Sequence, residues 1–113
     1  MEWTVAELAD RAGISGRTLR HYHRIGLLQP DRIGTNGYRY YGSGAVARLQ
    51  RILLLRETGM SLNAISGVLD ASDTPAAEVD ALEAHLEQLT EDRASLDRRI
   101  HAVTHTLEMR RQG

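Results

Sequence analysis

The chain has 113 residues, enough for one compact domain, and at this size a second copy would help to bury apolar surface. It contains no cysteine, which excludes disulfides and thiolate metal sites. No apolar run is long enough to span a bilayer and the N-terminus lacks the pattern of a signal peptide, so we expect a cytoplasmic protein without a membrane segment.

The net charge of -1 is unevenly distributed along the chain. Residues 1–60 carry nine arginines and five acidic residues, whereas residues 61–113 carry five arginines and ten acidic residues. A basic first half is typical of a protein that binds a polyanion such as nucleic acid. A solvated surface that binds nothing can show the same uneven distribution of charge. Whether the arginines form a binding pattern therefore decides between a nucleic-acid-binding surface and a solvated one.

Two short helices are predicted at the N-terminus. Thr4 and Glu7 have the spacing of a capping box, and apolar residues recur at helical spacing from there up to Gly13. Ser15 or Gly16 can cap a second helix that reaches about residue 25. Two helices joined by a short turn with glycine have the spacing of a helix-turn-helix unit.

A small β-wing is predicted over residues 31–41. Pro30 blocks further helix, and Asn36 followed by Gly37 is a strong hairpin signal. The residues directly after this turn have high strand propensity.

Two more helices follow the wing in the prediction. Ser43 can cap a third helix that runs to about Glu57 and is apolar on more than one side, so it should form the centre of the core. Ser61 can cap a short fourth helix, and residues 70–75 are expected to form a linker.

A long coiled-coil helix is predicted over residues 76–111. Apolar residues recur there in alternating steps of three and four, which is a heptad pattern: Val79, Leu82, Leu86, Leu89, Leu96, Ile100, Val103 and Leu107. Arg93 interrupts this seam, and Arg110 falls on it near its end. The seam requires another surface, so we expect a homodimer through residues 76–111, with a helix folded back on its own chain as the alternative.

The predicted fold is therefore mostly α, with two domains. Residues 1–72 form a winged helix-turn-helix with a small β-wing, and residues 73–113 form the linker and the dimerisation helix.

The second predicted helix places four basic or polar residues on one face, at positions i, i+3, i+4 and i+7: Arg17, Arg20, His21 and Arg24. Its other side carries three residues that should face the core: Leu19, Tyr22 and Ile25. Major-groove readers carry their contacts on this second helix, although a solvated helix face is the alternative.

The predicted wing carries Arg39 between Tyr38 and Tyr40, which suits contact with phosphate or a DNA groove. Alternation along a strand places Tyr38 and Tyr40 on one face and Arg39 and Tyr41 on the other. Tyr40 is equally well explained by packing. Ser43, at a helix N-terminus, is a natural phosphate site, although capping alone would explain it.

We do not expect an enzyme, a cofactor or a bound metal. His101 and His105 have the spacing of helical metal ligands, but they lie off the heptad seam and have no cysteine nearby. No nucleophile paired with a base, phosphate-binding glycine loop or catalytic carboxylate pair stands out in the sequence.

The run from Arg17 to Ile65 resembles the MerR family of bacterial transcription regulators. The matching elements occur in the order typical of the family: Thr18-Leu19-Arg20, Tyr22, Gly26-Leu27-Leu28, Pro30, Arg32, Gly37-Tyr38-Arg39, Tyr41, Leu49 and Gly59. With the heptad helix, the resemblance covers essentially the whole chain. It is strongest to the drug- and thiopeptide-responsive, TipA-type branch.

The resemblance implies a dimer joined by an antiparallel coiled coil. Such a dimer binds a pseudo-palindromic element in double-stranded promoter DNA and distorts its spacer so that RNA polymerase engages both promoter elements. The resemblance assigns DNA contacts to two groups of residues and backbone approach to the turn at 58–61. The two groups are Arg17, Thr18, Arg20, His21 and Tyr22 in the second helix, and Tyr38, Arg39 and Tyr41 in the wing.

Some features depart from the family pattern. His23 stands where an acidic residue is usual, and Gly42 where a small polar or acidic residue is usual. Metal-responsive members use cysteines near the end of the long helix, and this chain has none, so a response of that kind is excluded. Drug-sensing members continue into a ligand domain, so we expect either a shortened product without its sensor or a regulator that needs no effector.

Two other functions agree with parts of the sequence. An excisionase-type architectural protein has a similar winged fold and bends DNA, but the long heptad favours a dimeric regulator. A coiled-coil interaction module would explain residues 76–111 and would leave the arginine stripe and the wing without a purpose.

Overall fold

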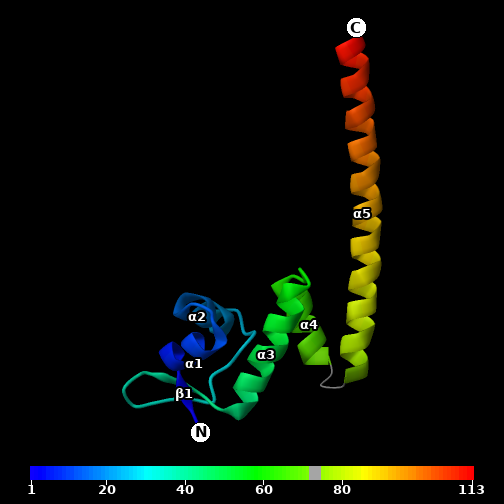
Figure 1. Ribbon diagram of the computed structural model, residues 1–113. Coiled ribbons are helices and arrows are strands. Elements are labelled where there is room, and N and C mark those ends of the chain that lie inside the picture. Colours follow the sequence, from blue (N-terminus) through cyan, green and yellow to red (C-terminus); the bar gives the residue numbers. More distant parts are fainter. Residues whose placement is uncertain (72–74) are drawn as a thin grey trace. The chain divides into compact units, whose positions relative to one another are not determined.

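The computed structural model describes residues 1–71 and 75–113, which fall into two compact units, Met1–Gly67 and Val68–Gly113. The first unit contains three helices, three short strands and the start of a fourth helix, and the second contains a single long helix after the end of that fourth helix (Figure 1). The predicted domain boundary between residues 72 and 73 lies outside the described residues. Within the described ranges, no helix combines the length and the hydropathy needed to cross a membrane.

Helix α1, Val5–Ala12, begins and ends as the sequence predicts. The Glu7 N–H donates to the Thr4 hydroxyl at 3.3 Å, and the Thr4 N–H donates to the Glu7 carboxylate at 3.0 Å, which completes the capping box. Hydrogen bonds to the Glu7 carboxylate, first from the Thr4 backbone N–H and then from the Thr4 side chain, hold the pKa of Glu7 below its usual value. Gly13 ends the helix with a φ of 70°, a conformation that favours glycine.

Helix α2, Gly16–Arg24, follows after three residues and confirms the helix-turn-helix unit. Ser15 is the N-cap of this helix. The chain turns sharply beyond the end of the helix at Gly26, which has a φ of 77°. Leu19 and Tyr22 point from this helix into the core, where they are 0% and 5% exposed.

A three-stranded antiparallel sheet in the order β1-β3-β2 contains the predicted wing. Strands β2, Arg32–Ile33, and β3, Arg39–Tyr41, form the hairpin, and β1, Trp3–Thr4, pairs with the other edge of β3. The sequence analysis did not predict β1, because two residues are too few to show the alternation of a strand.

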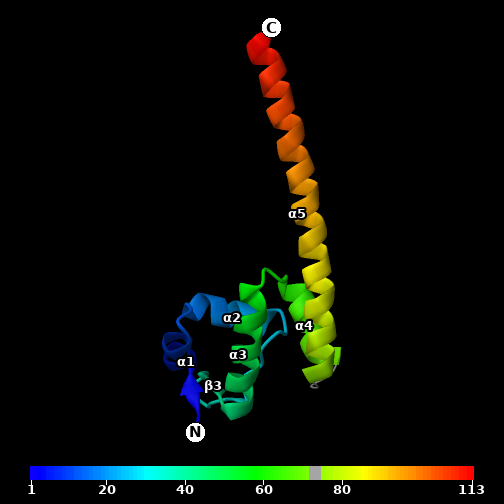
Figure 2. The ribbon, with the colours of Figure 1, turned by 45° about the vertical axis from the view of Figure 1, so that its right-hand side comes forward.

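Helix α3, Ser43–Glu57, runs through the centre of the first unit (Figure 2). It buries Leu49, Ile52 and Leu55 almost completely, which confirms the predicted core helix. Leu54, however, is 65% exposed and lines a largely apolar hollow of about 950 Å³ together with Trp3 and residues of α1. The apolar residues of α3 therefore extend beyond what the core of one chain covers.

Helix α4, Leu62–Ala71, starts at the predicted cap, where the Ala64 N–H donates to the Ser61 hydroxyl at 3.1 Å. The predicted linker over residues 70–75 is wrong at both ends. Residues 70 and 71 continue α4, and Pro75 is the first residue of the next helix, a position where its fixed φ is favourable.

Helix α5, Pro75–Gln112, is continuous over 38 residues (Figures 1 and 2). None of its residues is buried, and the apolar residues of its seam are between 37% and 65% exposed. A row of exposed leucines, isoleucine and valines of this length is unusual on a monomeric surface and is typical of a coiled-coil partner surface.

Candidate nucleic-acid interface

Helix α2 begins in a side-chain cap that involves one of the predicted contact residues. The Thr18 N–H donates to the Ser15 hydroxyl at 3.0 Å, and the hydroxyl oxygens of the two residues lie 2.9 Å apart. This cap satisfies a backbone donor that the first turn of a helix leaves unpaired. Thr18 is half-buried, so it helps to fix the start of α2, and its contact with DNA stays a prediction.

The three arginines of α2 lie exposed on the face opposite to its buried residues. Arg17, Arg20 and Arg24 are all exposed, as the predicted polar stripe requires. Among the described residues, none of these guanidinium groups forms an ion pair. Each guanidinium has up to five N–H donors and a permanent positive charge, so the stripe can bind phosphates or guanine edges.

His21 extends the stripe between the arginines. An Arg24 guanidinium nitrogen lies 3.4 Å from the Nδ1 atom of His21, and the His21 ring centre lies 6.4 Å from that of Tyr22. His21 is half-buried, and Tyr22 below it belongs to the core. Tyr22 therefore supports His21 from the core side, and a DNA contact of Tyr22 stays a prediction.

The prediction that Ile25 faces the core is wrong. Helix α2 ends at Arg24, Ile25 is its C-cap, and Ile25 is 49% exposed. The helical period no longer applies after the last helical residue, because the chain turns at Gly26. Leu27 and Leu28, each 1% exposed, fill the core after that turn instead.

The wing is closed by the turn that the sequence predicts. The Gly34 N–H donates to the Tyr38 carbonyl at 2.8 Å, and the Asn36 side-chain oxygen accepts from the Tyr38 N–H at 3.0 Å. Gly37 has a φ of 82°, which a residue with a side chain rarely adopts. The hairpin therefore presents Tyr38, which is 61% exposed, directly beyond its tip.

The predicted contact residues of β3 differ in exposure. Arg39 and Tyr40 are half-buried, whereas Tyr41 is 0% exposed and lies in the core. Burial raises the pKa of Tyr41, an effect that the positive charge of nearby Arg39 partly offsets. A side chain without accessible surface cannot bind DNA, so the structure contradicts the DNA contact assigned to Tyr41. It supports Tyr38 and Arg39 as the accessible pair.

The Tyr41 hydroxyl is buried and has no hydrogen-bond partner among the described residues. Because an unpaired buried hydroxyl costs about 1–3 kcal/mol, we expect Tyr41→Phe to leave the free energy of unfolding unchanged or to raise it by about 1 kcal/mol. Tyr41→Ala should lower it by about 3–5 kcal/mol, since it opens a cavity. Urea unfolding measures both. A tenfold loss of DNA affinity in Tyr41→Phe at unchanged stability would show instead that the hydroxyl contacts DNA.

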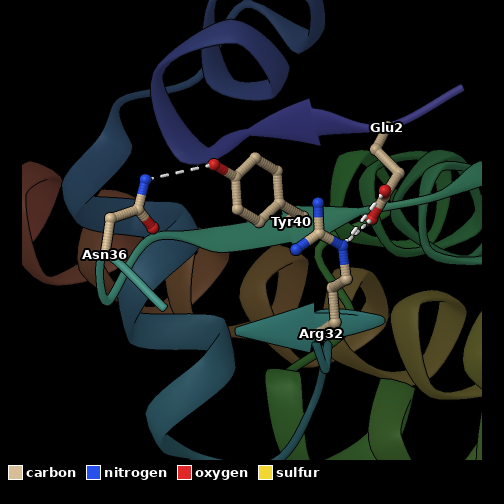
Figure 3. A network of polar contacts seen from close by, with 4 residues as sticks. All are labelled: Glu2, Arg32, Asn36 and Tyr40. Carbon is tan, nitrogen blue, oxygen red and sulfur yellow. Dashed lines mark hydrogen bonds and ion pairs between the residues drawn. The ribbon is translucent and has the colours of Figure 1, made fainter. Parts of the chain in front are cut away.

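A polar network on the wing joins residues that the site prediction did not include (Figure 3). The Arg32 Nε–H lies 3.0 and 3.1 Å from the two carboxylate oxygens of Glu2, and the guanidinium lies 4.2 Å from the centre of the Tyr40 ring. Asn36 donates to the Tyr40 hydroxyl at 3.4 Å. The exposed ion pair between Arg32 and Glu2 contributes little stability. Together with the cation–π contact it holds Arg32 and Tyr40 against each other on one face of the wing.

The network also bears on the packing alternative predicted for Tyr40. Arg32 lies directly opposite Tyr40 in the sheet, so the two share a face, as opposed residues do in antiparallel strands. Tyr40 is the support for a cation, in agreement with the packing alternative for this residue. Glu2 could not be found from the sequence, because it reaches Arg32 only through the pairing of β1 with β3.

The start of α3 differs from the prediction. Gly42, not Ser43, is the N-cap, and it offers no side-chain hydrogen bond, while Ser43 is already the first helical residue. The Asp31 carboxylate occupies the space that a Cβ atom at position 42 would need. A side chain at position 42 would have to displace this carboxylate. Ser43 is exposed at the helix N-terminus, and its contact with phosphate stays a prediction.

Two other arginines of the basic half have structural roles. The Arg48 Nε–H donates to the Leu27 carbonyl at 2.8 Å and ties α3 to the segment after α2. Arg56 donates to the Met60 carbonyl at 2.9 Å and closes the turn between α3 and α4, the turn that the resemblance places near the DNA backbone. The approach of this turn to DNA stays a prediction.

The positions of the histidines give no support to a metal site. Within residues 1–71 and 75–113, no group of three or more histidine, aspartate or glutamate side chains is placed to hold a metal ion.

The helix-turn-helix, the arginine stripe and the hairpin beside them define a winged helix-turn-helix protein. The chain belongs to the MerR family. Residues 3–72 match the family model described as MerR HTH family regulatory protein, and residues 46–108 match the one described as MerR, DNA binding.

The chain is similar over nearly its whole length to proteins that are named as transcription regulators. It is 37% identical to the HTH-type transcriptional activator TipA of Streptomyces coelicolor, over 100% of this chain and 44% of TipA. It is 39% identical to the regulator SkgA of Caulobacter vibrioides, over 93% of this chain and 40% of SkgA. The chain thus spans less than half the length of these relatives.

Solved structures show the same fold. MtaN, the N-terminal part of the Bacillus subtilis multidrug transporter activator, superposes with a TM-score of 0.83 at 35% identity, covering 93% of this chain and 97% of MtaN. HiNmlR, a MerR family regulator that lacks the sensor domain and is bound to promoter DNA, gives a TM-score of 0.62 at 28% identity, covering 95% of this chain and 88% of HiNmlR.

Proposed function

We propose that the chain is a dimeric, sequence-specific transcription regulator that binds a pseudo-palindromic promoter element and distorts it to control RNA polymerase. The observation that carries this proposal is the stripe of Arg17, Arg20 and Arg24, exposed and free of ion pairs among the described residues. Such residues on the second helix of a helix-turn-helix lie where major-groove readers have their base contacts.

The wing and the stripe have different chemistry and so different proposed roles. Arg20 and His21, from a rigid and capped helix, are proposed to face base edges, whereas Arg39 and Tyr38 are proposed to hold the wing on the sugar-phosphate backbone. A base-edge contact from arginine discriminates between base pairs, while a phosphate contact contributes affinity alone.

The homodimer is proposed from the exposed seam of α5. Leu86, Ile100 and Val103 are 65%, 62% and 59% exposed, so the free helix leaves its whole apolar row in water. Two copies place two recognition helices on one DNA molecule, and two-fold symmetry then requires a pseudo-palindromic site. An architectural protein of excisionase type or a coiled-coil module without a DNA role explains less of the chain.

The place of action is proposed to be the cytoplasm, because the relatives are regulators of transcription and work where the chromosome is. The contact with RNA polymerase is also proposed because the relatives are regulators of transcription.

The DNA distortion is proposed because the family acts on a promoter spacer. The free energy needed to bend the DNA is offset by the additional contacts that the bend permits.

Footprinting on the DNA upstream of the chain's own gene tests this proposal. We expect two protected half-sites, centred one or more helical turns of about 10 base pairs apart, with enhanced cleavage between them where the duplex is distorted. Protection of a single half-site would contradict a dimer. Protection spread evenly along any DNA fragment would favour the architectural alternative.

A further inference from the structure

Glu2 is joined to the wing through Arg32, the arginine of strand β2. The Arg32 Nε–H lies 3.0 and 3.1 Å from the two oxygens of the Glu2 carboxylate. Both side chains are accessible, since 55% of the Arg32 side chain and 39% of the Glu2 side chain are exposed. A guanidinium has five N–H donors, and among the described residues no hydrogen bond engages the two Nη groups of Arg32. Glu2 therefore neutralises the charge of Arg32 but leaves most of its donors unused.

The guanidinium of Arg32 belongs to a compact cluster on the wing. It lies 4.2 Å from the centre of the Tyr40 ring, and Asn36 donates to the Tyr40 hydroxyl from the other side of that ring (Figure 3). Gly34 makes this packing possible, because a Cβ atom there would lie 2.7 Å from the Asn36 side-chain oxygen and 2.8 Å from the Tyr40 ring. The aromatic ring thus gives the cation a defined position on the wing.

Arg32 lies on the same face of the wing as Tyr38, which is proposed to contact the DNA backbone. Alternation along β3 places Tyr38 and Tyr40 on one face, and Arg32 is opposite Tyr40 in the register of β2 and β3. The other face carries Tyr41, which is buried in the core, whereas Tyr38 is 61% exposed. Two residues of a strand span about 7 Å, which is within the reach of an arginine side chain. A DNA strand that lies against Tyr38 is therefore accessible to Arg32.

We propose that Arg32 is a further phosphate-binding residue of the wing and that Glu2 competes with DNA for its guanidinium. The inference rests on the proposed function, because it concerns the same DNA complex. In the free chain the guanidinium binds the Glu2 carboxylate, and in the complex it binds a backbone phosphate instead. One anion can replace the other, because a guanidinium binds carboxylate and phosphate through the same planar set of donors.

The exchange of partners requires little free energy. An exposed ion pair contributes little to stability, since water and salt screen it, so Arg32 can leave Glu2 readily. A DNA strand presents a row of phosphates, whose negative potential exceeds that of one carboxylate. Glu2 and the phosphate repel each other when both lie near Arg32, so Glu2 lowers the affinity for DNA of any sequence. Glu2 therefore sets the strength of backbone binding and takes no part in base reading.

The salt dependence of DNA binding reflects this competition. The pair of Glu2 and Arg32 is neutral as a unit, and the carboxylate that Arg32 leaves attracts a cation from solution, so the pair adds little to counterion release in the original chain. Glu2→Gln leaves one unbalanced arginine in each protomer. The slope of log K against log salt should then become steeper by up to about two units.

A double-mutant cycle on Glu2 and Arg32 tests the competition. The affinities of Glu2→Gln, Arg32→Ala and the double variant are measured by fluorescence anisotropy with operator and scrambled duplexes at one fixed salt concentration. We expect Glu2→Gln to bind both duplexes about tenfold more tightly and Arg32→Ala to bind both about tenfold more weakly, since phosphate contacts are independent of sequence. In the Arg32→Ala background, Glu2→Gln should change the affinity by less than about threefold.

Asp10→Asn is the matched control. Asp10 is an exposed acidic residue of α1 in the same compact unit, so this substitution changes the charge by the same amount. We expect it to change the affinity by less than about twofold. A gain equal to that of Glu2→Gln would overturn the inference. So would an equal gain from Glu2→Gln with and without Arg32, because Glu2 would then only repel DNA. Unchanged binding of scrambled DNA by Arg32→Ala would show that Arg32 does not bind phosphate.

The pairing in the free chain is tested separately by the NMR signal of the Arg32 Nε–H in isotope-labelled protein. We expect this proton to exchange with water more slowly in the original chain and in Asp10→Asn than in Glu2→Gln, because the carboxylate accepts its hydrogen bond. Equal exchange in all three would contradict the pair, even if Arg32→Ala failed to fold. A chain that binds neither duplex would refute the proposed function itself, whereas a chain that binds DNA without a gain in Glu2→Gln would refute this inference alone.

Discussion

Affinity for DNA should fall about 10⁴-fold when salt rises from about 50 to about 200 mM. Arg17, Arg20, Arg24 and Arg39 of two protomers can neutralise roughly eight phosphates, and each phosphate contact contributes about -0.9 to the slope of log K against log salt. The expected slope is therefore about -7. The three arginines of α2 are exposed and form no ion pair among the described residues, so they can bind DNA phosphates without first breaking an internal ion pair.

Fluorescence anisotropy of a labelled duplex at several salt concentrations measures this slope. Arg17→Ala and Arg24→Ala should each make it less steep by about two units, because each removes one contact from both protomers. Arg98→Ala removes an exposed arginine from α5 and should leave the slope unchanged. A slope near zero, or an equal change in the α5 control, would show that the stripe is not the DNA face.

Elements that depend on neighbouring residues could be predicted from the sequence. The Thr4 capping box, the Gly13 stop and the Asn36-Gly37 turn are fixed by side chains and backbone preferences within a few positions. The seam of α5 was predictable because its period extends over many turns. In each of these cases, the structure has the element where the local pattern places it.

Features that depend on distant residues could not be predicted. The two-residue strand β1 exists because β3 lies beside it, and the Asp31 carboxylate lies next to the Gly42 cap of α3 although the two residues are not neighbours in the sequence. Tyr41 was assigned to DNA from the family pattern, yet its side chain is buried in the core. Alternation along a strand gives two faces but does not say which one the helices cover.

The candidate site shows the same division. The face of α2 that carries Arg17, Arg20 and Arg24 followed from helical spacing alone and is confirmed as exposed. The pairing of Arg32 with Glu2, 30 positions away, has no local signal. Ile25 was misplaced because the helix ends one residue before it, and helix ends are the least certain part of a periodic pattern.

Substitutions in α2 and in the wing should differ in their effect on DNA specificity, because α2 is proposed to read bases and the wing to hold the DNA backbone. Arg20→Ala and His21→Ala should lose more affinity for the operator than for random DNA, because a bidentate contact between arginine and guanine discriminates by about 1–3 kcal/mol. In a dimer the contact occurs in both half-sites. Arg39→Ala should weaken operator and random DNA by similar factors, since a phosphate contact is independent of sequence.

Competition titrations at one fixed salt concentration, with operator and scrambled duplexes, measure this directly for the three variants and for Arg98→Ala as control. The account predicts a lower ratio of operator to random affinity for the Arg20 and His21 variants together, and an unchanged ratio for the Arg39 variant and the control. If both α2 variants kept the ratio of the original chain, sequence would be read elsewhere or through the deformability of the DNA, and the assignment of α2 as the base reader would be wrong.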